Sequence, residues 1–250
     1  LFFFLLIRPP PRSPLDRSSA ASDVYKRQLY DRENSAIAAL DASAIDPAIV
    51  RAAGALHLTG ITPALSGSAA ATCVNLANEA VDAGIPVALD VNFRSRLWNP
   101  AEARQGLSPL LQRITPLLCG IDDARTIWGI AGPPADVARA LLDYTTASVV
   151  VVTAGAGGAV AISRAAPNMA VHQAAPSVQP IDPVGAGDAF AAGLLHRWLD
   201  EPDDLPGALR SGVALASLKM TIAGDFAIVT AEELAEAIDL VDGDAHAIDR

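Results

Sequence analysis

Short apolar runs alternate along the chain with longer segments whose apolar residues recur at helical spacing. The short runs end at glycine or at a polar residue, as buried strands do. Strands that alternate with helices predict βαβ units and a mainly parallel sheet with helices on both faces. Predicted strands cover residues 55–60, 86–91, 116–119 and 148–153, with an antiparallel pair at 159–163 and 170–172, and predicted helices cover 66–83, 101–113, 122–128, 134–144, 186–199, 205–221 and 231–240.

Composition narrows the class of protein. The chain has 250 residues, of which 51% are hydrophobic and 18% are charged, and this is typical of a globular protein with its own core. A formal net charge of −10 argues against a general nucleic-acid-binding protein, which needs a basic surface. The only cysteines are Cys73 and Cys119, which excludes a disulfide framework and a cysteine-based zinc site. No apolar run reaches the length of about 18 residues that a membrane-spanning helix needs.

Residues 1–28 differ from the rest of the chain. They carry a net charge of +3, whereas residues 29–250 carry −13. A secretory signal fits poorly, because the apolar run comes first and stops at Arg8 before several prolines. Two interpretations remain: a native disordered tail, or a non-native segment, since SSAASDVYKRQ resembles translated sequencing-adapter sequence. On the second interpretation, residues 29–250 are a domain that is incomplete at its N-terminus.

The string IDPVGAGDAF at residues 181–190 carries the strongest chemical signal. Asp-Pro disfavours helix, and Gly-Ala-Gly then lets the backbone turn tightly and present consecutive N–H groups at a helix start. Such N–H groups and the helix dipole form an anion site. Asp188 lies in the first turn, where it can take a proton from a hydroxyl that attacks the anion. The alternative, an Asp that caps the helix beside glycines needed for packing, explains a lone Gly-x-Gly-Asp but not the whole string.

Three weaker signals lie at strand ends. The segment TAGAGG at 153–158 follows the valine-rich strand, and its glycines permit close approach to a nucleotide or form a hairpin turn. The segment DVNFRSRLW at 90–98 contains an arginine that can grip a carboxylate or phosphate, or lie solvated on the surface. His57 lies on an apolar strand, which favours a core residue with satisfied hydrogen bonds over a ligand.

Residues 182–193, DPVGAGDAFAAG, resemble the C-terminal signature of the ribokinase-like (PfkB) carbohydrate kinases. The resemblance implies a three-layer α/β/α sandwich with a mainly parallel sheet, from which the N-terminal strands and part of a lid are missing here. It implies Asp188 as catalytic base, with the amides of Gly185, Ala186 and Gly187 holding the transferring phosphoryl group. It also implies that Asp182 organises the loop or a nearby cation.

The same resemblance assigns a nucleotide side. Thr153, Gly155 and Gly158 are implied to border the ATP phosphates. The segment LKMTIAGDF at 218–226 is implied to lie near the adenine, where Lys219 or Gly224 would touch the nucleotide. A surface role is the alternative for that segment.

A magnesium ion is implied as well. Many relatives carry Asn-x-x-Glu after the strand that ends at Cys119, and this chain has Gly120 and Asp123 at those two positions. The resemblance therefore implies that Asp123 holds a hydrated Mg²⁺, an ion that usually keeps several waters.

Two segments resemble 2-keto-3-deoxygluconate (KDG) kinases within this family. In DVNFRSRLW the resemblance assigns Arg94 to the carboxylate of an acid substrate and Asn92 to the inner site. In LYDRENSA at 29–36 it assigns Tyr30 and Arg32 to substrate contacts. Asp31 stands where many of these relatives have a second tyrosine.

The predicted function is ATP- and Mg²⁺-dependent phosphorylation of the primary hydroxyl of a 2-keto-3-deoxy sugar acid in the cytoplasm. No nucleic acid or membrane partner is expected, and association through the lid is possible. One alternative is a kinase of a neutral sugar, such as a fructokinase. Another is a Rossmann-type NAD-dependent oxidoreductase, although no G-x-G-x-x-G opens a helix at residues 155–158. A third alternative is that the chain, as an incomplete domain, is inactive.

Overall fold

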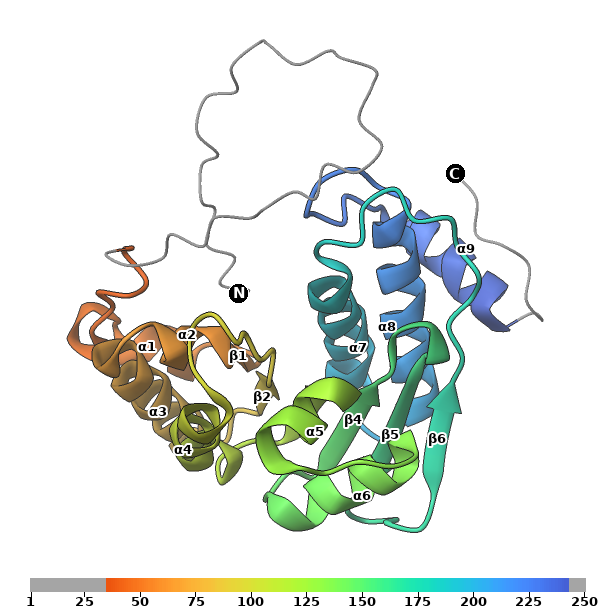
Figure 1. The fold of residues 1–250 in the computed structure, drawn as a ribbon. Coiled ribbons are helices and arrows are strands. Elements are labelled where there is room, and N and C mark those ends of the chain that lie inside the picture. Colours follow the sequence, from red (N-terminus) through yellow and green to blue (C-terminus); the bar gives the residue numbers. More distant parts are fainter. Residues whose placement is uncertain (1–34, 243–250) are drawn as a thin grey trace, which may run out of the picture.

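The computed structural model describes residues 35–242, so the candidate residues Tyr30 and Arg32 and the segment 1–28 lie outside the described part. Within this described part, six strands form one sheet in chain order (Figure 1). Strands β1 to β4 run parallel, and β5 and β6 continue the sheet in antiparallel fashion. Their bounds agree with the predicted ones to within one residue: β1 (Leu56–Thr59), β2 (Val87–Asp90), β3 (Pro116–Gly120), β4 (Val149–Thr153), β5 (Ala159–Ser163) and β6 (Ala170–Gln173).

Helices cover both faces of this sheet, which confirms the predicted three layers. One face packs against α1, α3, α4, α5 and α6, the other against α7 and α8, and α9 packs on the outside of α8 (Figure 1). The short helices α1 and α2 were not predicted. The helices are α1 (Pro47–Arg51), α2 (Ile61–Leu65), α3 (Gly67–Asp82), α4 (Pro100–Leu111), α5 (Ile121–Trp128), α6 (Pro134–Tyr144), α7 (Ala186–Asp200), α8 (Leu205–Met220) and α9 (Ala231–Asp242).

The valine run of β4 explains why the sheet needs two helical layers. Side chains alternate between the two faces of a strand. Val150 and Val152 pack in the cluster beneath α3 to α6, whereas Val149 and Val151 pack against α7 and α8. All four side chains are buried. A strand that is apolar on both faces is stable only between two layers, as is usual for parallel sheets.

Helix starts are set by local side chains. Ser66 caps α3 by accepting a hydrogen bond from the N–H of Ala69 at 3.0 Å. Asn99 and Glu102 form a reciprocal capping box at the start of α4. None of the described helices is long and apolar enough to cross a membrane.

Arg164, directly after β5, holds the connection between α6 and β4. Its guanidinium donates to the carbonyl oxygens of Ala147 at 2.9 Å and Thr145 at 2.8 Å, and also to that of Leu142. The fork of N–H donors of an arginine suits several acceptors at once. One side chain thus satisfies the carbonyls of a loop that would otherwise leave buried acceptors unpaired.

Arg164→Met is expected to lower the free energy of unfolding by about 1–3 kcal/mol, because partly buried carbonyls lose their donor. Urea denaturation measures the loss. Arg125→Met is the matched control, since Arg125 pairs with Asp122 on an exposed helix surface, and such pairs contribute roughly 1 kcal/mol at most. Equal losses in the two variants would contradict the proposed role of Arg164.

Candidate active site

Three carboxylates from distant parts of the chain meet at the carboxyl edge of the parallel strands. Asp90 ends β2, Asp123 lies in the first turn of α5 after β3, and Asp188 lies in the first turn of α7. The charges of Asp123 and Asp188 both act on Asp90, so the three groups share one site. This is the edge at which parallel α/β sheets bind ligands.

Asp90 is the most strongly perturbed of these groups. Burial raises its pKa to about 7, and the neighbouring charges of Asp188 and Asp123 add to the rise. The backbone N–H of Asn92 and the charge of Arg94 act in the opposite direction. Asp90 belongs to the predicted Asp-x-Asn-x-Arg segment, but we expected function from Asn92 and Arg94 and not from this carboxyl group. Its position at the end of a buried strand was the available signal.

Asn92 turns the chain after β2. Its φ of 38° lies in the left-handed region, which asparagine tolerates better than most residues. The turn allows the N–H of Phe93 to donate to Oδ2 of Asp123 at 3.1 Å. Arg94 follows on the exposed side of this turn and acts electrostatically on both Asp90 and Asp123. Asn92 and Arg94 thus lie next to the carboxylates, and the substrate contacts predicted for them stay predictions.

Asp123 is the residue predicted to hold magnesium. Burial raises its pKa, while the Phe93 N–H and Arg94 oppose the rise. Within residues 35–242, no three His, Cys, Asp or Glu side chains are grouped so as to hold a metal directly. A Mg²⁺ bound here would depend on waters and phosphate oxygens for most of its ligands, which is usual for this ion. The role of Asp123 stays a prediction.

The turn before α7 requires glycine at position 185. Gly185 has φ 87°, and a Cβ atom built on it would lie 2.3 Å from the carbonyl oxygen of Asp225. The first N–H groups of a helix have no partners within the helix, so Gly187 and Asp188 in the first turn of α7 present donors that suit an anion. The N–H of Ala186 donates to the carbonyl of Pro183 at 3.2 Å, a long bond that a bound anion would have to replace.

Asp182 connects the turn to the segment after α8. Its Oδ1 accepts from the N–H of Val184 at 3.1 Å, and its Oδ2 accepts from the N–H of Gly224 at 3.3 Å. Gly224 has φ 98° and lies in open space, so its backbone conformation rather than crowding favours glycine. Through these contacts Asp182 links the loop before α7 to the segment after α8.

Lys219, in the last turn of α8, is fully buried, so the surface role that we considered for it is wrong. Its Nζ donates to the carbonyl oxygens of Asp182 at 3.0 Å and Ile222 at 3.2 Å. Contact between Lys219 and a nucleotide stays a prediction. The sequence offered no sign that this lysine is buried beneath the turn at Gly185.

The glycines after β4 form the hairpin to β5. Gly155 has φ 54° and Gly158 has φ 81°, both in the left-handed region. A Cβ atom on Gly158 would lie 2.0 Å from the carbonyl oxygen of Gln173, so this glycine is needed for packing beside β6. Thr153 ends β4 at the same sheet edge as Gly120, its register partner on β3. The nucleotide contacts predicted for Thr153, Gly155 and Gly158 stay predictions.

His57 differs from expectation. It lies on β1 opposite Ala88 of β2, and its buried Nδ1 has no hydrogen-bond partner among the described residues. The expectation of a core histidine with satisfied hydrogen bonds is therefore wrong for this atom. Burial lowers the pKa of His57, while the charge of Asp188 opposes this effect. His57 thus belongs to the neighbourhood of the site, and the period-two alternation of β1 was the signal that placed it on the face opposite Leu56 and Leu58.

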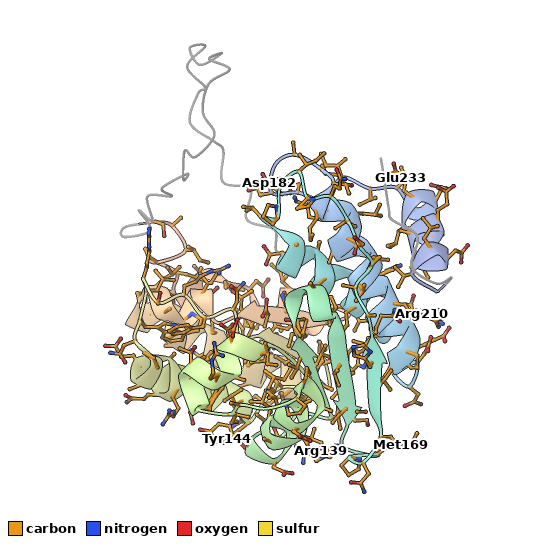
Figure 2. All side chains as sticks on the ribbon, turned by 45° about the vertical axis from the view of Figure 1, so that its right-hand side comes forward. Arg139, Tyr144, Met169, Asp182, Arg210 and Glu233 are labelled. Carbon is orange, nitrogen blue, oxygen red and sulfur yellow. The ribbon has the colours of Figure 1, made fainter. Side chains whose placement is uncertain are left out.

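The site occupies one end of the molecule. Figure 2 shows Asp182 at the end opposite Arg139, Tyr144 and Met169. At the Asp182 end, a glycine turn opens a helix, a carboxylate lies in the first turn of that helix, and further carboxylates and an arginine follow the neighbouring strands. These features define an α/β protein with a glycine turn and a carboxylate at the carboxyl edge of its parallel strands. The sheet runs in simple chain order among the described strands, without the reversal of a Rossmann sheet.

The chain belongs to the pfkB family of carbohydrate kinases. The sequence model of that family matches residues 22–229, which confirms the predicted family and excludes the Rossmann alternative. The match begins within the segment 1–28 that we set apart, and the boundary at residue 28 stays a prediction.

Relatives and solved structures agree with this assignment. The chain is 35% identical to a 2-dehydro-3-deoxygalactonokinase of Haloferax volcanii, over 82% of this chain and 64% of that protein. It therefore spans less than two thirds of the length of that relative. The fold matches a 2-dehydro-3-deoxygluconokinase of Thermotoga maritima with TM-score 0.72 at 24% identity, covering 84% of this chain and 68% of that one. It also matches an aminoimidazole riboside kinase of Salmonella enterica, solved with its riboside and an ATP analogue, with TM-score 0.67 at 23% identity, covering 80% and 67%. The predicted ribokinase-like fold is confirmed.

The raised pKa of Asp90 predicts a specific pH dependence of stability. Between about pH 4 and about pH 7 the folded protein keeps a proton that the unfolded chain has released, so the free energy of unfolding falls as pH rises through this window. Asp90→Asn removes this proton linkage. The variant is expected to be about 1–3 kcal/mol more stable than the unmodified chain near pH 8 and to show a flatter pH profile.

Urea denaturation at several pH values measures this effect. Asp82→Asn, an exposed carboxylate at the end of α3, is the control and should follow the unmodified chain. Parallel profiles for Asp90→Asn and the unmodified chain would show that Asp90 is not buried as described.

Proposed function

We propose that the chain is the larger part of an ATP-dependent kinase that phosphorylates the primary hydroxyl of a 2-keto-3-deoxy sugar acid. One observation carries the proposal. Asp188 lies in the first turn of α7, directly after the turn at Gly185, and its charge acts on Asp90 at the end of β2, as does the charge of Arg94. An acceptor for a hydroxyl proton, an anion turn and an exposed cation for a substrate carboxylate are thus adjacent. The names of the Haloferax and Thermotoga proteins support this substrate class.

The chain's own groups suit each task of phosphoryl transfer. Asp188 accepts the proton of the substrate hydroxyl, and general-base help of this kind contributes typically about 10²–10⁴-fold. The backbone N–H groups at the start of α7, from Gly185 to Gly187, stabilise the charge on the transferring phosphoryl group. Arg94 pairs with the carboxylate of the sugar acid, for which its planar donor fork is well suited.

Two further groups complete the proposal. Mg²⁺ fits a hydrated site at Asp123, whose carboxylate oxygen is the ligand type this ion prefers, and when bound it neutralises phosphate charge. Thr153 at the end of β4, together with Gly155 and Gly158 in the hairpin that follows it, borders the ATP phosphates. Tyr30 and Arg32 would add substrate contacts from outside the described residues.

Asp188→Asn is expected to lower kcat by about 10²–10⁴-fold and to change KM for ATP only slightly, because the amide keeps the shape but accepts no proton. A coupled assay that detects ADP measures the turnover. Asp200→Asn, at the exposed far end of α7, should keep normal activity. Near-normal turnover by Asp188→Asn contradicts the base assignment, and a chain without any ATP-dependent transfer contradicts the proposed activity of this chain.

Arg94→Ala separates an acid substrate from a neutral one. The value of kcat/KM is expected to fall by about 10²-fold or more on 2-keto-3-deoxygluconate and to stay unchanged on fructose, because only the acid loses a charged partner. Arg113→Ala, which is exposed after the end of α4, is the control. Activity on fructose that exceeds activity on the acid, with no selective effect of Arg94→Ala, would favour the alternative of a neutral-sugar kinase.

A further inference from the structure

A fully buried lysine lies directly behind the anion turn. Lys219 is the largest of the completely buried side chains, and it belongs to the last turn of α8. Its Nζ is bound by the carbonyl oxygens of Asp182 and Ile222. The first carbonyl belongs to the loop that leads into Gly185, and the second belongs to the segment that follows α8.

The position of Lys219 relative to the turn is set by close packing. A Cβ atom built on Gly185 would lie 3.3 Å from Cε of Lys219 and 2.3 Å from the carbonyl oxygen of Asp225. The side chain of Lys219 therefore packs against Gly185, the residue whose positive φ angle precedes the first turn of α7.

Other hydrogen bonds join the same two segments. The N–H groups of Ile181 and Asp182 both donate to the carbonyl of Met220, at 2.8 Å and 3.2 Å. Asp182 adds the bond from the N–H of Gly224. These bonds hold the two segments together, and Nζ of Lys219 joins them once more through the carbonyl oxygens of Asp182 and Ile222.

The burial of a charged side chain costs free energy of solvation. An ammonium group removed from water loses favourable solvation, and this loss destabilises the fold unless other groups compensate. The two carbonyl dipoles compensate in part, and a negative ligand in the adjacent turn would compensate further. At short range inside a protein, a positive charge acts more strongly than it does in water.

We propose that Lys219 is a positioning residue of the phosphoryl site. Its ammonium fixes the 182–185 loop against residues 220–225, and it adds positive potential beneath the N–H groups that receive the phosphoryl group. This inference rests on the proposed function, because it needs a phosphorylated ligand at the turn. It assigns Lys219 an action through the loop, whereas the sequence suggested direct contact with the nucleotide.

The first experiment compares ATP with adenosine in variants of the 250-residue chain. Lys219→Met removes the charge and the donors, whereas Lys219→Gln removes the charge but keeps N–H donors. Calorimetry is expected to show ATP affinity reduced by about tenfold or more in both variants, with adenosine affinity nearly unchanged. Arg164→Met is the matched control, since it also removes a cation that binds carbonyl oxygens but lies in another part of the fold.

The expected pattern is selective. Lys219→Met and Arg164→Met should both lower stability, but only the Lys219 variants should lower the ratio of ATP to adenosine affinity. Equal losses for ATP and adenosine would assign Lys219 a structural role only and overturn the proposal. A chain that unfolds on substitution cannot answer this question, so a second measurement uses the unmodified protein.

The chain contains only two lysines, Lys26 and Lys219, so lysine labelled with ¹³C and ¹⁵N gives two side-chain signals. The signal of Lys219 is expected to shift on addition of ATP or tripolyphosphate and to stay in place with adenosine. ATP binding with no shift of this signal would overturn the inference while the proposed function stands. If the chain binds no ATP at all by calorimetry, the proposed function fails for this chain, and the inference fails with it.

Discussion

The rest of the site depends on the close approach of two backbone segments at Gly185. Only glycine leaves room for the carbonyl of Asp225, and only there does the chain take the positive φ that starts α7 in its observed direction. That direction brings Asp188 to the edge where β2 and β3 end. A side chain at this one position would move the helix start and separate Asp188 from the strand ends.

The negative charge of the site is unfavourable for the anionic ligands that we propose. The chain is acidic and gathers three carboxylates where we propose that it binds anionic ligands. The raised pKa of Asp90 is one physical cost of this arrangement, since burial and like charges oppose its ionisation. Positive potential therefore has to be built locally, and the start of α7, the exposed Arg94 and the buried Lys219 are its sources. Local sources of this kind explain how an acidic protein can attract acidic ligands.

The elements of the fold could be predicted because they depend on local pattern. Apolar runs and helix-stop signals placed the six described strands to within one residue, and the string at 181–190 located the glycine turn that precedes α7. What could not be predicted depends on contacts between distant residues. The burial of Lys219, the carbonyl of Gln173 against Gly158 and the environment of His57, whose Nδ1 finds no partner among residues 35–242, all arise from such contacts. The short helices α1 and α2 carry too few residues for a periodic signal.

The strand order has a consequence for how the protein is made. Each parallel strand pairs with the one synthesised just before it, so the sheet from β1 to β4 can assemble outward as the chain leaves the ribosome. Asp188 joins Asp90 only when α7 docks on the far face. The repulsion between these carboxylates is thus postponed to a late step of folding, when a large apolar core is already in place to oppose it. Translation would complete the scaffold first and its reactive centre last.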